Sequence, residues 1–291
     1  MKNLVYLCLF LNKNYIHFLE LLFSSAVLFS KESLATTDFL VMTQADFVED
    51  IQNIGKKLGI HILCWTQEKP ISVFISTILR YEIFRWENIH QYTKILYLDT
   101  DILINGELNK VFQLLKVPEK LYTFREGPIS HEYWGGHEIF DFEEEDKELN
   151  KETIGFCTGA MLFEMNLSIQ RTFEMGKAYM LKKLQVPGSK IPICYDQPYI
   201  NYVCVKYGLN ENESLGTVCI NRAVELVDGY VIYHFPATMF TKKYTNMLIM
   251  LTEMSKELED SPLKQITMDY IEQGQDFLNE YDEYQDKYKK F

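Results

Sequence analysis

Two aspartates, Asp99 and Asp101, follow a short apolar run at residues 94–98 and are separated by a single residue. Carboxylates at this spacing after a buried strand can converge on one divalent cation. Such a cation neutralises the charge that builds up on a diphosphate leaving group. Because an isolated pair of this kind is more often a turn former or a helix cap, its weight depends on the elements around it.

A second polar cluster, residues 12–15, follows the apolar run at residues 4–10. Both runs are short and bounded by polar residues, which is typical of strands buried on both faces. Ligands of parallel sheets bind at the carboxyl ends of the strands. The sequence therefore predicts that residues 12–15 and 99–101 lie at the same edge of one sheet.

Strand-like and helical patterns alternate through the first half of the chain, which predicts right-handed βαβ units on a mostly parallel sheet. The expected strands are residues 4–10, 38–42, 60–65, 94–98, 154–164 and 229–235. The expected helices are residues 15–30, 46–58 (ended by Gly59), 73–89 and 196–207, followed by a helical and increasingly polar region from residue 245. Residues 126–150, rich in glycine and acidic side chains, are expected to form a long exposed loop.

The composition of the 291 residues is that of an ordinary globular protein with a net charge of −12. This charge disfavours a nucleic-acid partner, although a small phosphorylated ligand needs only one local cation or metal. The six cysteines have no zinc-site spacing, and we expect free thiols in a reducing compartment, the cytoplasm. No apolar run reaches the length of a membrane span; a signal anchor near the N-terminus is the weaker alternative.

Four segments in order resemble glycosyltransferase family 8, the family of glycogenin and bacterial lipopolysaccharide galactosyltransferases. They are ISTILRYEIFRWENIHQYTKILYLDTDILINGEL at 75–108, IGFCTGAMLFEMN at 154–166, YDQPYIN at 195–201 and YHFPA at 233–237. The resemblance covers residues 4 to about 243. It implies an α/β fold of the GT-A (Rossmann-like) type, with a mostly parallel central sheet flanked by helices. We expect a catalytic domain at residues 1–244 and a C-terminal helical extension at residues 245–291.

The resemblance implies a metal site made of Asp99, Asp101 and His234. Two carboxylates and one imidazole suit Mn²⁺ better than Mg²⁺, which remains the second choice. For a histidine alone, the simpler interpretation is a partly buried side chain at a strand end.

The resemblance also implies a binding site for a nucleotide sugar. Its expected residues are Asn12, Asn14, Tyr15, Arg80, Thr100, Thr158 and Gly159, with Asp196 and Gln197 beside the donor sugar as catalytic residues. Tyr15 would stack on a uracil, and the Arg80 fork would bind oxyanions. The structural alternatives are a polar turn and cap at residues 12–15, a snorkelling Arg80, and a helix N-cap pair at residues 196–197.

Two departures from the family pattern stand beside these matches. Cys157 occupies the place of an asparagine, and Pro236 follows the histidine motif where relatives have a glycine. Lys242 and Lys243 are displaced from the position of the family's lysine, and the sequence leaves open whether either of them is a phosphate-binding lysine.

The sequence thus predicts a metal-dependent, retaining hexosyltransferase that moves a sugar from a nucleotide sugar, UDP-sugar by preference, to a hydroxyl of a glycan, lipid or protein. One alternative is a non-catalytic protein that binds nucleotide sugars. Another is a haloacid-dehalogenase-type phosphatase with Asp99 as nucleophile, although that class has its aspartate pair after the first strand. A homodimer is left open.

Overall fold

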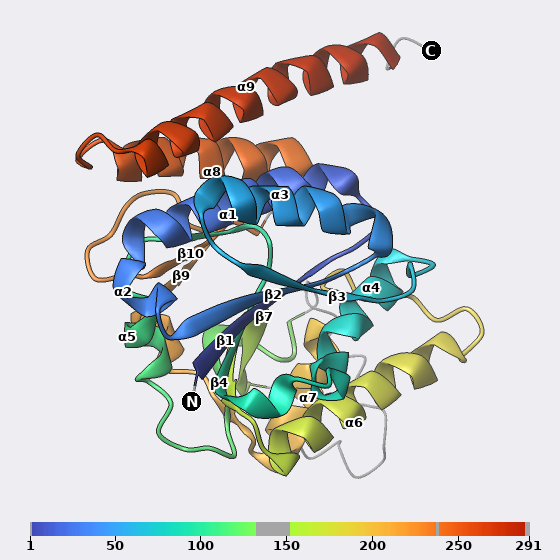
Figure 1. Cartoon of the computed structure of the whole chain (residues 1–291). Coiled ribbons are helices and arrows are strands. Elements are labelled where there is room, and N and C mark those ends of the chain that lie inside the picture. The colour runs from blue at the N-terminus through green and yellow to red at the C-terminus, as the bar shows by residue number, and fades with distance from the viewer. Residues whose placement is uncertain (1, 132–151, 237–238, 289–291) are drawn as a thin grey trace.

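A computed structural model of the chain describes residues 2–131, 152–236 and 239–288, and its main feature is a seven-stranded sheet (Figure 1). The strand order is β3-β2-β1-β4-β7-β6-β8. The strands are β1 (Lys2–Leu9), β2 (Thr37–Thr43), β3 (Ile62–Thr66), β4 (Tyr92–Leu98), β6 (Leu121–Pro128), β7 (Ile154–Glu164) and β8 (Asn210–Glu211). From β3 to β4 the neighbours pair in parallel, whereas β7 is antiparallel to both β4 and β6.

A smaller sheet lies at the carboxyl end of β4 and has the order β5-β10-β9. Its strands are β5 (Ile102–Ile104), β9 (Cys219–Asn221) and β10 (Ile232–His234). Because β5 begins directly after the aspartate pair, this sheet ties the second half of the chain to residues 99–101.

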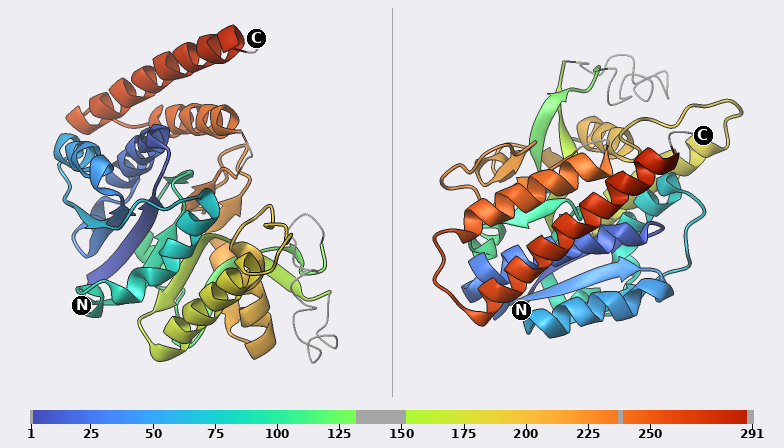
Figure 2. Two further views of the ribbon diagram at one scale, coloured as in Figure 1. Left: turned by 90° about the vertical axis from the view of Figure 1, so that its right-hand side faces the viewer. Right: turned by 90° about the horizontal axis from the view of Figure 1, so that it is seen from above.

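Helices cover both faces of the main sheet, as the expected α/β fold requires (Figures 1 and 2). They are α1 (Ile16–Phe29), α2 (Lys31–Leu34), α3 (Val48–Leu58), α4 (Val73–Leu79), α5 (Leu108–Phe112), α6 (Leu167–Leu184), α7 (Gln197–Tyr207), α8 (Phe240–Ser255) and α9 (Pro262–Tyr288). Helices α1, α3, α8 and α9 lie on one side of the sheet, and α4, α6 and α7 lie on the other. The predicted end of α3 at Gly59 is confirmed, since Gly59 has φ +70°.

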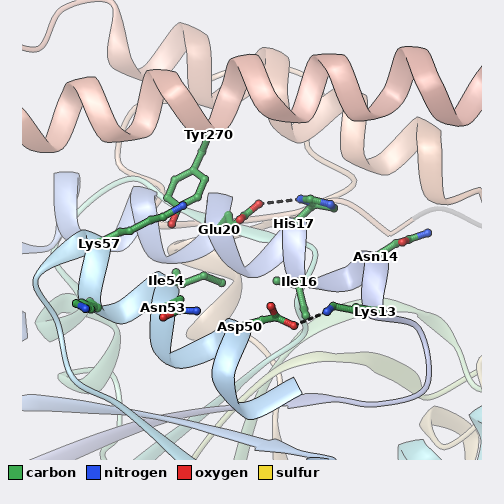
Figure 3. Close-up of a pocket in the computed structure, with 11 residues that line it drawn as sticks. Lys13, Asn14, Ile16, His17, Glu20, Asp50, Asn53, Ile54, Lys57 and Tyr270 are labelled. Atoms are coloured by element: carbon green, nitrogen blue, oxygen red, sulfur yellow. Dashed lines mark hydrogen bonds and ion pairs between the residues drawn. The ribbon is translucent and has the colours of Figure 1, made fainter. Parts of the chain in front are cut away.

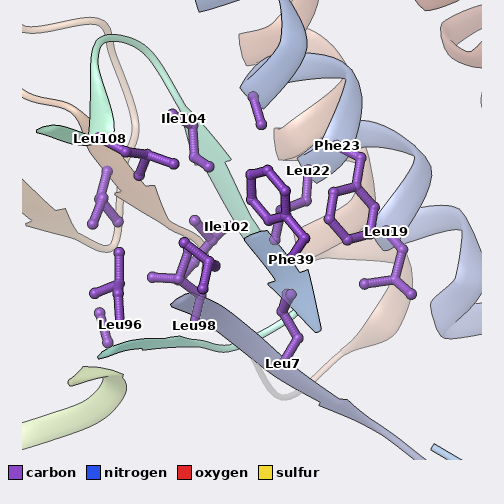
Figure 4. Close-up of a cluster of buried hydrophobic side chains, with 14 of the residues drawn as sticks. Leu7, Leu19, Leu22, Phe23, Phe39, Leu96, Leu98, Ile102, Ile104 and Leu108 are labelled. Carbon is purple, nitrogen blue, oxygen red and sulfur yellow. The ribbon is translucent and has the colours of Figure 1, made fainter. Parts of the chain in front are cut away.

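The central strand β1 shows why this layering follows from the sequence. Leu4 and Tyr6 pack on the α4/α6/α7 side, whereas Val5, Leu7 and Leu9 pack on the α1/α3 side. Successive side chains of a strand point to opposite faces, so an uninterrupted apolar run buries both faces. Figure 4 shows the core on the α1/α3 side of the sheet, in which side chains of the strands and of α1 interdigitate.

Two predicted boundaries were wrong: the end of the helix expected over 73–89 and the start of the loop expected at 126–150. The α-helix expected over 73–89 ends at Leu79 and continues as 3₁₀ turns at Arg80–Arg85 and Ile89–Gln91. The Tyr6 hydroxyl of β1 donates to the Arg80 carbonyl oxygen (3.1 Å), at the point where the α-helix gives way to the 3₁₀ turn.

The start of the loop expected at 126–150 was predicted too early, because Leu121–Pro128 forms strand β6, which pairs with β7. Residues 132–150 of that loop lie outside the described residues. The cysteines Cys8, Cys64, Cys157, Cys194, Cys204 and Cys219 are unpaired, as expected. Every helix within the described ranges is too short or too polar to span a bilayer.

The C-terminal helices pack directly on the rest of the chain. Helix α8 starts at Phe240, so position 245 lies inside one continuous helix. A third core joins α1, β5 and β10 to α8 and α9; its buried members include Phe18, Leu103 and Tyr244. The division into domains at 244/245 stays a prediction.

The short helices α2 and α5 cap each other at their N-terminal ends. Glu107, which precedes α5, accepts hydrogen bonds from the backbone N–H groups of Glu32 and Ser33 and from the Ser33 hydroxyl. In return, the hydroxyls of Ser30 and Ser33 accept from the backbone N–H groups of Leu108 and Asn109. Each helix therefore has its first unpaired donors satisfied by the other.

This arrangement predicts a pH-dependent contribution of Glu107 to stability. Partial burial alone would raise the pKa of Glu107, but the hydrogen bonds from Ser33 and Glu32 lower it below its usual range. A lowered pKa stabilises the fold above the unfolded-state pKa of about 4.3 and loses this effect as the pH falls through the folded-state pKa. We expect Glu107→Gln to lower Tm at pH 7 by about 2–4 °C, the equivalent of about 1 kcal/mol.

Thermal unfolding measured between pH 3 and pH 7 checks this, with the exposed Glu119→Gln as the matched control. The difference between Glu107→Gln and wild type should shrink as the pH falls. A difference that is constant over this range would contradict the role of the charge.

Candidate functional site

The predicted site residues meet at a cleft beyond the carboxyl ends of β1 and β4. Two adjoining pockets of about 330 Å³ and 190 Å³ share the side chains of Thr77, Arg80, Asp99, Asp101 and Lys243. One or both pockets are lined by these predicted residues: Asn12, Tyr15, Arg80, Asp99, Thr100, Asp101, Thr158, Gly159, Asp196, Gln197 and His234. The two strand ends at which the sequence predicts a site therefore border one cleft.

Asp99, Asp101 and His234 form a compact group whose ligand atoms all lie within 4.8 Å of one another. The His234 Nε2 atom is 3.6 Å from Asp101 Oδ1 and 4.0 Å from Asp99 Oδ2. Strand pairing brings them together, because β10 is antiparallel to β5 with His234 opposite Ile102. The backbone N–H of Phe235 also donates to the Asp101 carbonyl oxygen (2.9 Å).

The orientation of the His234 ring is set by a residue that the sequence did not indicate. The Nδ1 atom lies 2.9 Å from Oδ1 of Asn221, which stands opposite His234 on β9. An amide oxygen only accepts hydrogen bonds, so Nδ1 carries the proton and Nε2 presents its lone pair to the carboxylates. A metal-binding histidine has this type of second contact in most proteins.

Each aspartate uses one oxygen for a side-chain donor and turns the other toward His234. Asp99 Oδ1 lies 3.3 Å from an Arg80 nitrogen and accepts from the Tyr97 hydroxyl, whereas Asp101 Oδ2 lies 2.7 Å from Lys243 Nζ. The remaining atoms, Asp99 Oδ2 and Asp101 Oδ1, converge with His234 Nε2. Two carboxylate oxygens and one imidazole nitrogen fit a divalent cation.

The ionisation of Asp101 suits that role. Burial alone would raise its pKa, but the positive charge of the neighbouring Lys243 lowers the pKa of Asp101 below its ordinary value. The reverse holds for Lys243: burial would lower its pKa, and Asp101 raises it above the usual value. Both groups are therefore charged at neutral pH.

Arg80 is buried at the centre of the cleft, with 8% of the residue exposed. Its Nη1 atom lies 3.6 Å from an Asp196 oxygen and donates to the Thr158 carbonyl oxygen (3.4 Å), and the guanidinium stands 4.7 Å from the Tyr97 ring centre. An arginine that snorkels would send its head into water. Here the head points into the site instead.

Asp196 and Gln197 use their side chains across the cleft. Although Asp196 precedes α7, it makes no side-chain cap; it accepts from the Tyr81 hydroxyl and pairs with Arg80. Burial raises the pKa of Asp196, an effect that Arg80 and Tyr81 oppose. Gln197 accepts from the Thr158 backbone N–H (3.2 Å) and donates to Glu126 (3.3 Å). Asp196 therefore stands at the N-cap position of α7, but its side chain is used in the cleft and makes no capping hydrogen bond.

The residues after β1 divide between two places. Tyr15 lines the larger site pocket, with Lys243 Nζ 5.6 Å from its ring centre. The Asn12 side chain accepts from the Asn14 backbone N–H (3.0 Å), which is the cap that the polar turn allowed. Asn14 lines a separate pocket of about 700 Å³ between α1, α3 and α9 (Figure 3), so the structure does not bring it to the site.

Three side chains that the sequence did not select complete the site. Tyr97 lies two residues before Asp99 on β4, so the period of a strand placed it on the same face as Asp99. Tyr81 follows Arg80 directly and reaches Asp196. Lys243, which the sequence could not distinguish from Lys242, comes from the first turn of α8 and contacts Asp101.

The small-residue segment expected as a turn lies inside strand β7, where it makes room for His234. Cys157, in place of the family's asparagine, has its Sγ 4.0 Å from His234 Nδ1 and accepts from the Gly159 backbone N–H. Burial holds the pKa of the Cys157 thiol well above its ordinary value, so the thiol stays neutral. At Gly159, an added Cβ would stand 2.4 Å from His234 Cε1 and 2.7 Å from Nε2.

We predict that Gly159→Ala displaces the His234 ring and weakens the binding of Mn²⁺ by about tenfold or more, because the added methyl group overlaps the imidazole. The measurement is a thermal-shift titration with Mn²⁺. Gly216→Ala is the control, since its added Cβ would meet nothing nearer than 3.9 Å. Unchanged binding in Gly159→Ala would show that the ring can leave without cost.

Solved glycosyltransferase structures share this fold at low sequence identity. The apo structure of the bifunctional glycosyltransferase WbbM has a TM-score of 0.58 at 12% identity over 88% of this chain and 51% of that chain. The apo form of the glycosyltransferase GlyE of Streptococcus pneumoniae TIGR4 has 0.54 at 16%, over 98% and 64%. The galactosyltransferase LgtC, solved with donor and acceptor sugar analogues, has 0.55 at 14%, over 89% and 97%.

This chain therefore spans about half of the WbbM chain and just under two thirds of the GlyE chain. No curated protein matches its sequence. The profile described as glycosyl transferase family 8 matches residues 6–210, which is more than half of the chain and includes both aspartates and Asp196. The chain belongs to glycosyl transferase family 8 and has the GT-A fold.

Proposed function

We propose that this protein is a metal-dependent, retaining hexosyltransferase that uses a nucleotide sugar, preferentially a UDP-sugar, and a hydroxyl acceptor on a glycan, lipid or protein. One observation carries the proposal: Asp99, Asp101 and His234 converge in the cleft where the other family motifs also meet. The bound cation, Mn²⁺ ahead of Mg²⁺, would supply the positive charge that stabilises the diphosphate leaving group.

The larger pocket is assigned to the nucleotide. Tyr15 offers an aromatic face to the base, and Asn12 stands beside it at the end of β1. Lys243 and Arg80 offer positive charge to the diphosphate from opposite elements, α8 and the turn after α4. Because Arg80 is already held by Asp99 and Asp196, its fork is preorganised and binding an oxyanion costs little ordering.

The smaller pocket is assigned to the sugar. Its lining includes Thr158, Gly159, Asp196 and Gln197, next to the metal group. Gln197 is oriented by Thr158 and Glu126 and lines the face of the sugar opposite the leaving group. A departing phosphate oxygen would take the acceptor proton on the face that it leaves, which results in retention of configuration.

The second candidate is a non-catalytic nucleotide-sugar-binding protein, and the observation that favours it is Cys157 beside His234. Donor hydrolysis separates the two: a transferase releases free sugar slowly from a UDP-sugar with Mn²⁺, and a binding protein does not. The phosphatase alternative finds no support, because the aspartate pair follows β4 in a family 8 glycosyltransferase fold. A cytoplasmic location and a homodimer remain proposals from the sequence.

We expect UDP binding to require both Mn²⁺ and the aspartate pair. Asp99→Asn or Asp101→Asn removes one ligand charge and should weaken Mn²⁺-dependent UDP binding about 100-fold or more. Calorimetry with and without Mn²⁺ measures this, with the exposed Asp228→Asn as control. Tight, metal-independent UDP binding in either variant would refute the metal role.

The stereochemical prediction concerns the product. From an α-linked UDP-sugar, the enzyme should form an α-linked product, because the departing phosphate and the incoming hydroxyl share one face of the sugar. Proton NMR of the product in the presence of a hydroxyl acceptor gives the anomeric configuration directly. A β-linked product would show inversion and would sink the retaining mechanism.

A further inference from the structure

We propose that the two C-terminal helices are part of the donor site, because Phe240 of α8, supported by α9, positions the ring of Tyr15. This inference rests on the proposed function, in which Tyr15 carries the nucleotide base. It makes Phe240 a positioning residue for nucleotide binding and gives the region around residues 240–281 a role beyond covering the core.

The ring of Tyr15, which directly precedes α1, is held between one residue of α1 and one residue of α8. Its ring centre lies 5.0 Å from that of Phe18 and 5.5 Å from that of Phe240, which it meets edge to face. Phe240 also meets Phe18 at 4.9 Å, so the three rings form a closed triangle. Lys243, one turn after Phe240, stands over the Tyr15 ring. The position of Tyr15 therefore depends on where α8 begins.

Phe240 in turn is held from outside by α9. Its ring lies 5.9 Å from Phe277 and 5.8 Å from Tyr281, and these two α9 rings lie 5.8 Å from each other. Edge-to-face and offset arrangements at these distances are favourable beyond the apolar area that they bury. The contacts thus run without a break from α9 through Phe240 to the proposed base-binding ring.

A close approach of the two helices fixes this path. Gly274 lies where α9 crosses α8, and an added Cβ there would stand 2.4 Å from the Tyr244 hydroxyl and 3.0 Å from Leu248. Tyr244 is fully buried and contacts Phe18 and Phe240. Because α9 is seated on α8 through Gly274, Phe277 is carried to its place against Phe240 one turn later.

The test compares two ligands that share the metal and the diphosphate but differ in the base. Calorimetry is carried out in Mn²⁺ with UDP and with inorganic pyrophosphate, for the full-length protein and its variants. Since stacking of a base on an aromatic side chain is a substantial part of affinity, we expect Phe240→Ala to weaken UDP binding about tenfold and pyrophosphate binding less than about twofold. Phe240→Tyr, which keeps the ring, should restore UDP binding.

On α9, Phe277→Ala should weaken UDP binding about threefold, a part of the stacking effect, with pyrophosphate unchanged. Leu278→Ala is its matched control, because Leu278 is the adjacent buried residue of the same core but has no aromatic ring to offer to Phe240. Equal losses for UDP and pyrophosphate in Phe240→Ala would mean a general structural effect and would overturn the positioning role. Unchanged UDP binding would overturn it as well.

A failure of the proposed function has a different signature, since wild type would then bind pyrophosphate and Mn²⁺ without any gain from the uridine. The positioning claim can be tested even in that case, by a crystal structure of Phe240→Ala without nucleotide. We expect the Tyr15 ring to have left its place against Phe18. A ring that stays there would refute the inference.

Discussion

The balance of charge in the cleft is the constraint on which the rest of the site depends. Three carboxylates, those of Asp99, Asp101 and Asp196, face two side-chain cations, the buried Arg80 and the partly buried Lys243. Unpaired charges in a protein interior are costly, so each carboxylate has a partner at a defined oxygen. The two cations leave one carboxylate charge unbalanced. The carboxylate oxygens that have no cationic partner, Asp99 Oδ2 and Asp101 Oδ1, point toward His234 Nε2. A divalent cation is the ligand that such an arrangement is suited to hold.

This balance explains why distant elements have to meet at one point. The aspartates come from the end of β4, Arg80 from the 3₁₀ turn after α4, Asp196 from the start of α7 and Lys243 from α8. The small sheet adds the imidazole, since β10 pairs with β5 immediately after the aspartates. A change in any one element leaves a buried charge without its partner, which couples the stability of the fold to the integrity of the site.

Aromatic packing performs the corresponding task on the nucleotide side of the cleft. The third core joins α1 to α8 and α9. Through this core the C-terminal helices contact Tyr15, which lines the larger pocket. Figure 2 shows that α8 and α9 lie on the side of the sheet that α1 and α3 cover. The cleft therefore has a charged side, to which strand ends, the turn after α4, the start of α7 and helix α8 contribute, and an aromatic side formed by residues of α1 and α8.

The sequence by itself determined the layered α/β fold, the strand ends that border the cleft and the grouping of Asp99, Asp101 and His234. These features follow from local periodicity and from ordered motifs, and both are properties of short segments. Only the tertiary structure decided that Lys243 rather than Lys242 reaches Asp101, that Asn221 orients His234, and that Asn14 faces another pocket. The helix expected over 73–89 also ends at Leu79, beside the hydrogen bond from the Tyr6 hydroxyl to the Arg80 carbonyl oxygen. Each of these outcomes depends on a contact between residues far apart in the chain, and no local pattern encodes which surface a side chain will meet.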